Sequence, residues 1–443
     1  MLQAKEFLQE ECKNVELSLK EALRYEYGRS RSKDFYDECT YRLQNLKRQI
    51  DASKASDLPE LEEYSTLLSS LSALITRIER SHLGEFSWPF ADSLELLARA
   101  VCQGVNGKDE KYGAPIFAIS AEGGLEAYEL HIEQGAVNFN FKRRIFNIVF
   151  PRTLKHHVLL HPILGHELGH AATTVPSMDD ALSRMVLTRL EEGPLESEAK
   201  LTSWIDNTPT DSTKYTADMI EEMLYSWTEE LFCDLFGLML FGPSFVAAHY
   251  SLLSAIDPRG FDLGDEHPPN MTRFDMLLKA VEILGWQKVP KTGNAQLRVG
   301  VERFWKSLNH APGAIPSWAT ICTTEQIQGA LEGLKSILQP LGVAMYTPPA
   351  KDVLEHLVES LHNRIPPIGN SVKDDGVPEL TDLDFRSILY AGWVEWHGQA
   401  QSVAESARMS FSDINRLCDR AILQQLAIDL WKKTGRTGTL GAD

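Results

Sequence analysis

The chain has 443 residues, of which 43% are hydrophobic and 24% charged, a composition typical of a folded globular protein with two or three domains. Its formal net charge of -18 argues against a nucleic-acid-binding protein, because neutralising phosphates requires a basic face that is not evident in the sequence. The same negative charge disfavours binding to anionic membrane surfaces.

The N-terminus and the cysteines bear on the cellular location. The stretch "MLQAKEFLQEECKNVE" is acidic and lacks an apolar leader, so no secretory signal is expected. The most apolar stretch, "LFCDLFGLMLFGPSFVAA", is interrupted by Asp234, Gly242 and Pro243 and is a poor candidate for a membrane span. The 6 cysteines are scattered without a CxxC pair, which argues against a disulfide framework and against a cysteine-based zinc site. We therefore expect a cytoplasmic protein that does not enter a membrane.

Residues 1–83 are predicted to form a helical hairpin or coiled-coil arm. Apolar residues recur there at alternating spacings of four and three, the pattern of helices packed along one face. The repeating positions are Leu8, Cys12, Val15, Leu19 and Ala22, then Leu43, Leu46 and Ile50, and finally Leu61, Tyr64, Leu68, Leu71, Ile75 and Ile78. Cap-type residues and Pro59 in "SKASDLPE" divide the pattern into two or three helices. Two interpretations stay open: a support for the next domain, or an arm that binds a protein partner or a second copy of the chain.

From about residue 85 the pattern changes to short strands. The segments "GAPIFAIS", "EAYELHIEQG" and "GAVNFNFKRRIFNIVFP" alternate apolar and polar residues between glycines, and Pro151 favours an edge position for the last of them. The rest of the chain is predicted to be mainly helical, apart from a loop rich in Pro, Gly and Asp at 364–382. The predicted fold is α+β and predominantly helical with a small edge sheet, divided into domains at 1–83, 84–300 and 301–443.

The main chemical signal is the stretch "HPILGHELGHAAT" at residues 161–173. Pro162 suits the first turn of a helix, and apolar residues follow at helical spacing. His166 and His170 then lie at i and i+4, so both imidazoles project from one face of that helix. Two imidazoles placed in this way can share one Zn²⁺, with Glu167 beside the position of a bound water.

A metal held by two histidines needs a third protein ligand. The downstream glycine and histidine of metzincins are absent, because "HAATTVP" has Thr173 and Pro176 in those places. A second predicted helix, "WTEELFCDLFGLMLF", offers Glu230 and, four residues later, Asp234. This helix is apolar nearly all round from 231 to 241, so an aspartate there is costly unless it is paired or near a metal. We predict Glu230 as the third ligand of one zinc ion per chain, and Asp234 as the residue that orients a ligating histidine.

"HELGH" together with "EELFCD" resembles the gluzincin zinc metallopeptidases, the class of thermolysin and of the CAAX prenyl protease family. The sixty residues from His170 to Glu230 are closer to the spacing of the CAAX prenyl protease family, and a later His-Pro and arginine are similar to that group too, at His267, Pro268 and Arg273 in "DEHPPNMTRFDML". No membrane span is visible, so the nearest resemblance is to soluble relatives of that family. The resemblance covers residues from about 140 to 280 and implies a zincin-like catalytic domain within 84–300.

The resemblance implies zinc ligation by His166, His170 and Glu230, with Glu167 as general base. Zinc lowers the pKa of a water toward neutrality, and Glu167 takes the proton as that water attacks a carbonyl. His267 or Arg273 would lie near the substrate. The candidate donors to the oxyanion are His267, Arg273, Tyr250 and His249, and His267 is preferred. His267 could equally be a histidine bonded to backbone in a turn. An extended peptide substrate is expected to pair with the strand "NIVFP".

The predicted function is that of a zinc-dependent metalloendopeptidase acting on a polypeptide substrate and regulated through its helical arm. Two alternatives stay open. One is a catalytically silent zinc-binding scaffold, which Glu167 disfavours because a structural site needs no base. The other is a zinc hydrolase of a small amide. The neighbouring His156, His157 and His161 in "LKHHVLLHP" are expected to be structural.

Overall fold

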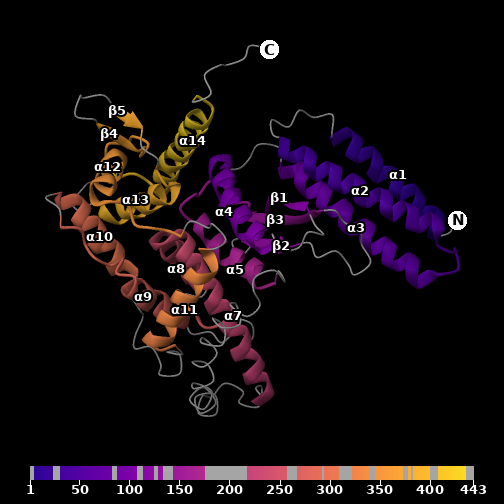
Figure 1. Ribbon diagram of the computed structural model, residues 1–443, viewed down its shortest axis with the longest axis horizontal. Coiled ribbons are helices and arrows are strands. Elements are labelled where there is room, and N and C mark those ends of the chain that lie inside the picture. The colour runs from indigo at the N-terminus through magenta and orange to yellow at the C-terminus, as the bar shows by residue number, and fades with distance from the viewer. Residues whose placement is uncertain are drawn as a thin grey trace. The chain divides into compact units, whose positions relative to one another are not determined.

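A computed structural model describes the chain at residues 4–22, 30–81, 87–106, 113–123, 128–132, 143–174, 217–256, 267–291, 294–308, 322–339, 345–372, 378–380, 383–399 and 408–435 (Figure 1). The chain divides into two compact units, the first comprising residues 1–86 and 106–155 and the second residues 87–105 and 156–443. The described residues are predominantly helical, with a three-stranded sheet in the first unit. The prediction of a mostly helical α+β chain with a small sheet is thereby confirmed.

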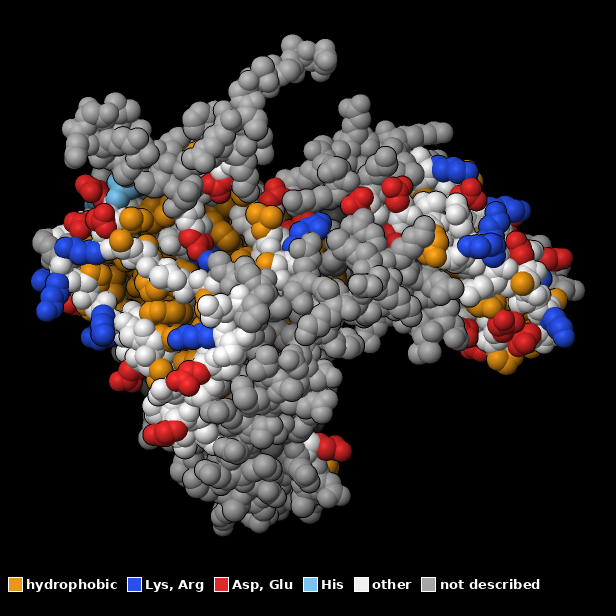
Figure 2. Space-filling model, viewed as in Figure 1, with side chains coloured by type: hydrophobic (Ala, Val, Ile, Leu, Met, Phe, Trp, Pro, Cys, Tyr) orange, Lys and Arg blue, Asp and Glu red, His pale blue; other side chains and the backbone are white. Residues whose placement is uncertain are grey.

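Three helices open the first unit: α1 (Ala4–Ala22), α2 (Ser30–Ala52) and α3 (Leu58–Ser81). They pack against one another because each turns an apolar stripe inward. The predicted apolar positions whose side chains are described are all buried: Leu8, Cys12, Val15, Leu19, Leu43, Leu46, Ile50, Leu61, Tyr64, Leu68, Leu71 and Ile75. The outer faces of these three helices carry a mixture of acidic and basic side chains (Figure 2). The helical prediction for this segment is confirmed, with three helices; the side chains of Ala22 and Ile78 lie outside the described residues.

The sheet contains β1 (Gly113–Glu122), β2 (Glu129–Ile132) and β3 (Arg143–Pro151) in the order β1-β3-β2. Strand β3 is in the middle, since Ile148 faces Ile119 of the parallel strand β1 and Leu130 of the antiparallel strand β2. The prediction that Pro151 marks an edge strand is therefore wrong. Proline is tolerated there because it is the last residue of β3. Asn147, Ile148 and Val149 have partners on both sides, so this part of "NIVFP" has no free backbone edge to which a peptide substrate could add.

The sheet shares its core with the N-terminal helices: Ile116, Ala118 and Ile145 belong to the same buried cluster as the apolar stripes of α1 to α3. The sequence predicted this sheet within the domain at residues 84–300, beside the metal-binding helix. The boundary predicted after residue 83 falls outside the described residues, and the one predicted after residue 300 falls inside a helix (Ala295–Leu308).

The second unit is built of helices and one short hairpin. Its elements are α4 (Trp88–Asn106), the 3-10 turn η1 (His161–Ile163), α5 (Leu164–Thr174), α7 (Ala217–Phe241), α8 (Pro243–Ile256), α9 (Asn270–Ile283), α10 (Ala295–Leu308), α11 (Thr324–Leu338), α12 (Lys351–His362), β4 (Asn370–Val372), β5 (Pro378–Leu380), α13 (Phe385–Gly398) and α14 (Phe411–Gly435). The segment predicted as a loop at 364–382 contains the β4–β5 hairpin. Among the described helices, none is both long enough and apolar enough to cross a membrane.

A sharp turn between α7 and α8 shapes the site. Gly242 stands there with φ of +63°, and a side chain on it would overlap the ring of Tyr346. Only glycine satisfies both the left-handed backbone and the lack of space. The turn folds α8 back along α7, so that His249 of α8 returns to the level of Asp234 on α7.

Candidate metal centre

Helices α5 and α7 approach each other to backbone contact. A Cβ atom on Gly169 would lie 2.7 Å from Cα of Cys233, and one on Gly165 would lie 2.9 Å from Cα of Gly237. Neither position has space for a side chain. Because each glycine of α5 directly precedes a histidine, this close approach brings both imidazoles of "GHELGH" to the ligand-bearing stretch of α7.

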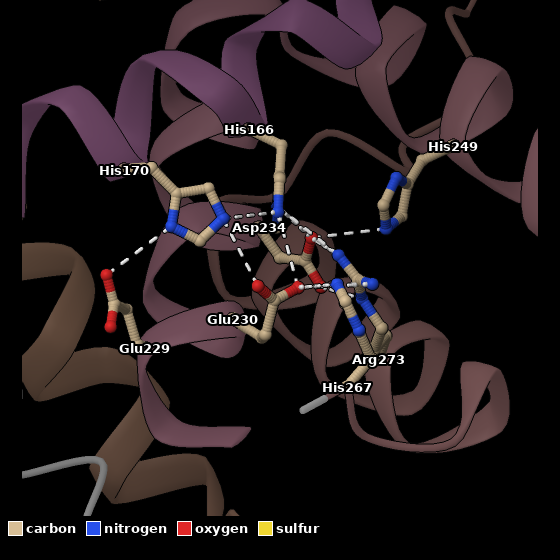
Figure 3. Close-up of polar contacts among 8 residues, drawn as sticks. All are labelled: His166, His170, Glu229, Glu230, Asp234, His249, His267 and Arg273. Atoms are coloured by element: carbon tan, nitrogen blue, oxygen red, sulfur yellow. Dashed lines mark hydrogen bonds and ion pairs between the residues drawn. The ribbon is translucent and has the colours of Figure 1, made fainter. Parts of the chain in front are cut away.

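The three predicted zinc ligands converge at this crossing (Figure 3). His170 Nε2 lies 3.1 Å from His166 Nε2 and 3.1 Å from one carboxylate oxygen of Glu230. His166 Nε2 lies 3.3 Å from the other oxygen of Glu230. Ligands at about 2.0–2.1 Å from a tetrahedral zinc ion are separated from each other by about 3.3–3.4 Å. The spacing of these donor atoms therefore fits a single divalent cation.

Glu230 provides a second test of the fit. Its Oε2 atom is buried and accepts no hydrogen bond within the described structure, although Arg273 Nη1 lies 3.4 Å away and His267 Nε2 lies 3.6 Å away. Arg273 compensates part of the Glu230 charge, and a bound metal ion would satisfy the buried oxygen that no hydrogen-bond donor reaches. The residues present thus suit a metal ion on chemical grounds as well as by spacing.

Cys233 is a possible ligand that was not predicted. It is fully buried on α7, three residues after Glu230. One ligand atom from each of His166, His170 and Cys233 lies within 4.8 Å of the others, so these three residues form a group that could hold a metal ion. The isolated position of Cys233 in the sequence suggested no metal site. The available signal was its helical spacing of three from Glu230, which places both side chains on one face.

Asp234 occupies the buried side of the site, where its side chain has no exposed surface. Its Oδ1 atom accepts a hydrogen bond from His166 Nδ1 at 2.9 Å and one from Arg273 Nη2 at 2.7 Å, and Oδ2 accepts one from Arg273 Nε at 2.8 Å. His249 Nε2 lies 3.1 Å from Oδ1 without hydrogen-bond geometry. With Nδ1 of His166 held by the carboxylate, Nε2 is the nitrogen that faces Glu230, which is the arrangement expected of a ligand-orienting aspartate.

The electrostatics of the site favour positive charge near Glu230 and Asp234. Burial opposes ionisation of both carboxylates, but His166 and His170 lower the pKa of Glu230, and Arg273 lowers the pKa of Asp234 well below its usual range. Burial also opposes protonation of His166, yet Asp234 and Glu230 raise its pKa. The two carboxylates therefore stay ionised and attract a cation.

Glu167 is placed differently from the other acidic residues. It is partly buried beside the histidines and makes no hydrogen bond or ion pair to any other residue that the structure describes. Burial raises its pKa above the ordinary value, which brings it closer to neutral pH and makes the carboxylate a better proton acceptor. A carboxylate without a fixed partner is free to exchange a proton with a bound molecule.

The exposed side of the site is formed by His170 and His267, whose side chains are 32% and 59% exposed. The Nδ1 atom of His170 lies 3.4 Å from Oε1 of Glu229, a contact that was not predicted from the sequence. Its signal was the position of Glu229 directly before the predicted ligand Glu230. The site is therefore accessible to solvent through these two side chains.

The predicted oxyanion donors lie at different depths. His267 stands at the exposed side, near Glu230. Arg273 is 4% exposed and is bound to Asp234, a position that suits a group holding the carboxylates; its role toward a substrate stays a prediction. His249 is 3% exposed, and burial lowers its pKa to about 4. Tyr250 packs against Phe274 with ring centroids 4.7 Å apart.

The additional histidines before α5 contact aromatic rings. His161 packs on Phe90 with ring centroids 5.0 Å apart, and His157 stacks on Phe411 at 6.0 Å. His156 is exposed. These contacts agree with the structural roles expected for them.

No protein-family model matches this chain, and neither does any curated protein or solved structure.

Proposed function

We propose that this protein is a zinc-dependent metalloendopeptidase of the gluzincin type. The observation that carries the proposal is the convergence of His166, His170 and Glu230 at 3.1–3.3 Å, the separation of zinc ligands, with the carboxylate of Glu167 beside them and unpaired among the described residues. A base next to such a cluster is what hydrolysis requires and what a purely structural metal site does not need.

Each residue then has a defined task. A bound Zn²⁺ supplies a water of lowered pKa and polarises the carbonyl under attack. Glu167 accepts the proton of the attacking water and transfers it to the leaving amine. Asp234 fixes the tautomer and orientation of His166, and Arg273 keeps Asp234 ionised. His267, at the exposed side, donates a hydrogen bond to the developing oxyanion.

The peptide-bond substrate is inferred from the gluzincin resemblance. A small amide would be hydrolysed by the same residues, so the substrate class needs its own assay. The helical arm at residues 1–83 is proposed to bind a partner or a second copy of the chain, and thereby to regulate the enzyme.

A catalytically silent zinc-binding scaffold is the second candidate, and Cys233 is the observation that favours it. Together with His166, His170 and Glu230 it would complete four protein ligands, the usual composition of a structural zinc site. The position of Glu167 weighs against this candidate.

Elemental analysis and peptide hydrolysis, measured on the same preparations, test the proposal. We expect about one zinc ion per chain in the wild type and in Glu167→Gln, and a large loss of zinc in Glu230→Gln. Hydrolysis of an unstructured polypeptide should fall by about 10²-fold or more in both variants. Glu222→Gln is the matched control, because Glu222 is an exposed residue of the same helix. A Glu167→Gln protein as active as the wild type would refute the peptidase proposal. Zinc binding without hydrolysis of any polypeptide or small amide would favour the scaffold.

A further inference from the structure

Cys233 has no task in the peptidase mechanism, yet it lies within the metal centre. It follows Glu230 by three residues on α7, so both side chains face α5. Its side chain is fully buried. Its sulfur lies directly against α5, since a Cβ atom on Gly169 would be 3.0 Å from Sγ. The glycine that allows the helices to touch therefore also makes space for this thiol beside the histidines.

The distances allow the sulfur to reach the same cation as the histidines. A ligand atom of Cys233 and one from each histidine lie within 4.8 Å of one another. Around a zinc ion, a thiolate at about 2.3 Å and an imidazole at about 2.0–2.1 Å are separated by about 3.5 Å. A side-chain adjustment of about 1 Å brings the sulfur and the imidazoles from the separation in this structure to the separation expected around zinc, while both helices stay in place. Thiolate and imidazole together are a preferred donor set for zinc.

We propose that Cys233 is a fourth, exchangeable ligand of the cation held by His166, His170 and Glu230. This inference rests on the metal site of the proposed function. On binding, the thiol releases its proton to solvent and the sulfur forms a bond to the metal. Four protein ligands leave no position for a water, so the closed set is inactive. On release, the thiolate takes up a proton and a water enters the position that hydrolysis needs. The intact chain is thus a peptidase with a low basal activity, set by the fraction of molecules in which Cys233 is released.

Cobalt titration of the metal-free full-length protein tests the proposal. Co²⁺ adopts zinc sites, and a bound thiolate produces an intense thiolate-to-cobalt charge-transfer band in the near ultraviolet. We expect that band in the wild type and in the control Cys322→Ser, which removes another buried cysteine of the second unit. In Cys233→Ala the band should be absent, while about one cobalt still binds with affinity lowered about tenfold or more. Peptide hydrolysis by the zinc-loaded Cys233→Ala protein should exceed that of the wild type.

The proposal is overturned if wild-type protein binds cobalt without the charge-transfer band, or if the band persists in Cys233→Ala. Absence of the band in the wild type overturns the proposal even if the variant fails to fold. Glu230→Gln separates the two inferences. A wild-type band combined with unchanged cobalt affinity in Glu230→Gln would support Cys233 as a ligand and refute the proposed ligand set. Cobalt binding that depends on Glu230 but shows no thiolate band would support the proposed ligand set and refute Cys233 as a ligand. Absence of cobalt binding in the wild type would refute both.

Discussion

Replacement of Asp234 by asparagine is the substitution whose consequences the structure defines most fully. Asp234 has no exposed side-chain surface and contacts His166, Arg273 and His249. Asparagine keeps the shape but removes the charge, which leaves the buried guanidinium of Arg273 with only the Glu230 carboxylate, 3.4 Å away. Breaking a buried ion pair on one side costs about 3–5 kcal/mol. We expect the free energy of unfolding of the metal-free protein to fall by that amount.

Zinc binding by Asp234→Asn should weaken as well. When the histidines are taken as neutral and only Glu230, Asp234 and Arg273 are counted, one net negative charge remains for the cation, and the variant removes it. The contact that orients His166 also weakens, so we expect a loss of zinc affinity of about 10–100-fold.

Urea unfolding in the presence of a chelator, followed by tryptophan fluorescence, to which the buried Trp227 on α7 contributes, measures stability separately from metal affinity. Zinc competition with a chromophoric chelator measures affinity. Asp275→Asn is the control, because its pair with Lys279 on α9 is partly exposed and should be worth less than about 1 kcal/mol. If Asp234→Asn stays within about 1 kcal/mol of the wild type and binds zinc equally well, the assignment of Asp234 is wrong.

Three further predictions concern the helix crossing, the first unit and the metal. Gly169→Ala places a Cβ atom 2.7 Å from Cys233 Cα, so it should destabilise the protein by about 1–3 kcal/mol and lower its zinc affinity. Urea unfolding measures the loss of stability, and zinc competition measures the loss of affinity. If neither changes, helices α5 and α7 can separate to admit the methyl group. Leu46→Ala removes a fully buried side chain of α2 and should cost about 2–5 kcal/mol in the unfolding of the first unit without changing zinc stoichiometry, which elemental analysis can check. Adding zinc at about 1,000 times its dissociation constant should stabilise the folded protein by about 4 kcal/mol, so calorimetry should show a rise of several degrees in the unfolding temperature that Glu230→Gln does not share.

Local patterns in the sequence predicted much of the fold and of the site. The apolar spacing from Leu8 to Ile75 identified the buried stripes of three helices, because a helix turns every third or fourth residue to the same face. The same rule places His166 and His170 together. Asp234 was recognisable because a single charge in an otherwise apolar helix must have a partner.

The features that the sequence did not reveal depend on contacts between distant segments. Pro151 constrains its own backbone but does not determine which strands pair with β3, so the middle position of that strand was not predicted. Cys233 is sixty-three residues from His170 and acquires a possible role only because Gly169 lets α5 and α7 touch. The contact between Glu229 and His170 arises in the same way.

The unequal exposure of the two histidines has a kinetic consequence. The side chain of His166 is 7% exposed, whereas that of His170 is 32% exposed and that of His267 is 59% exposed. A hydrated cation arriving from solvent meets the outer pair before it meets His166, and it sheds its waters in steps as it moves inward. Changes at His267 should therefore alter chiefly the rate of metal uptake, whereas changes at the proposed ligand His170 should alter both uptake and retention. Changes around His166 should alter chiefly how long the metal stays bound, so that loading and retention are set at opposite ends of the same site.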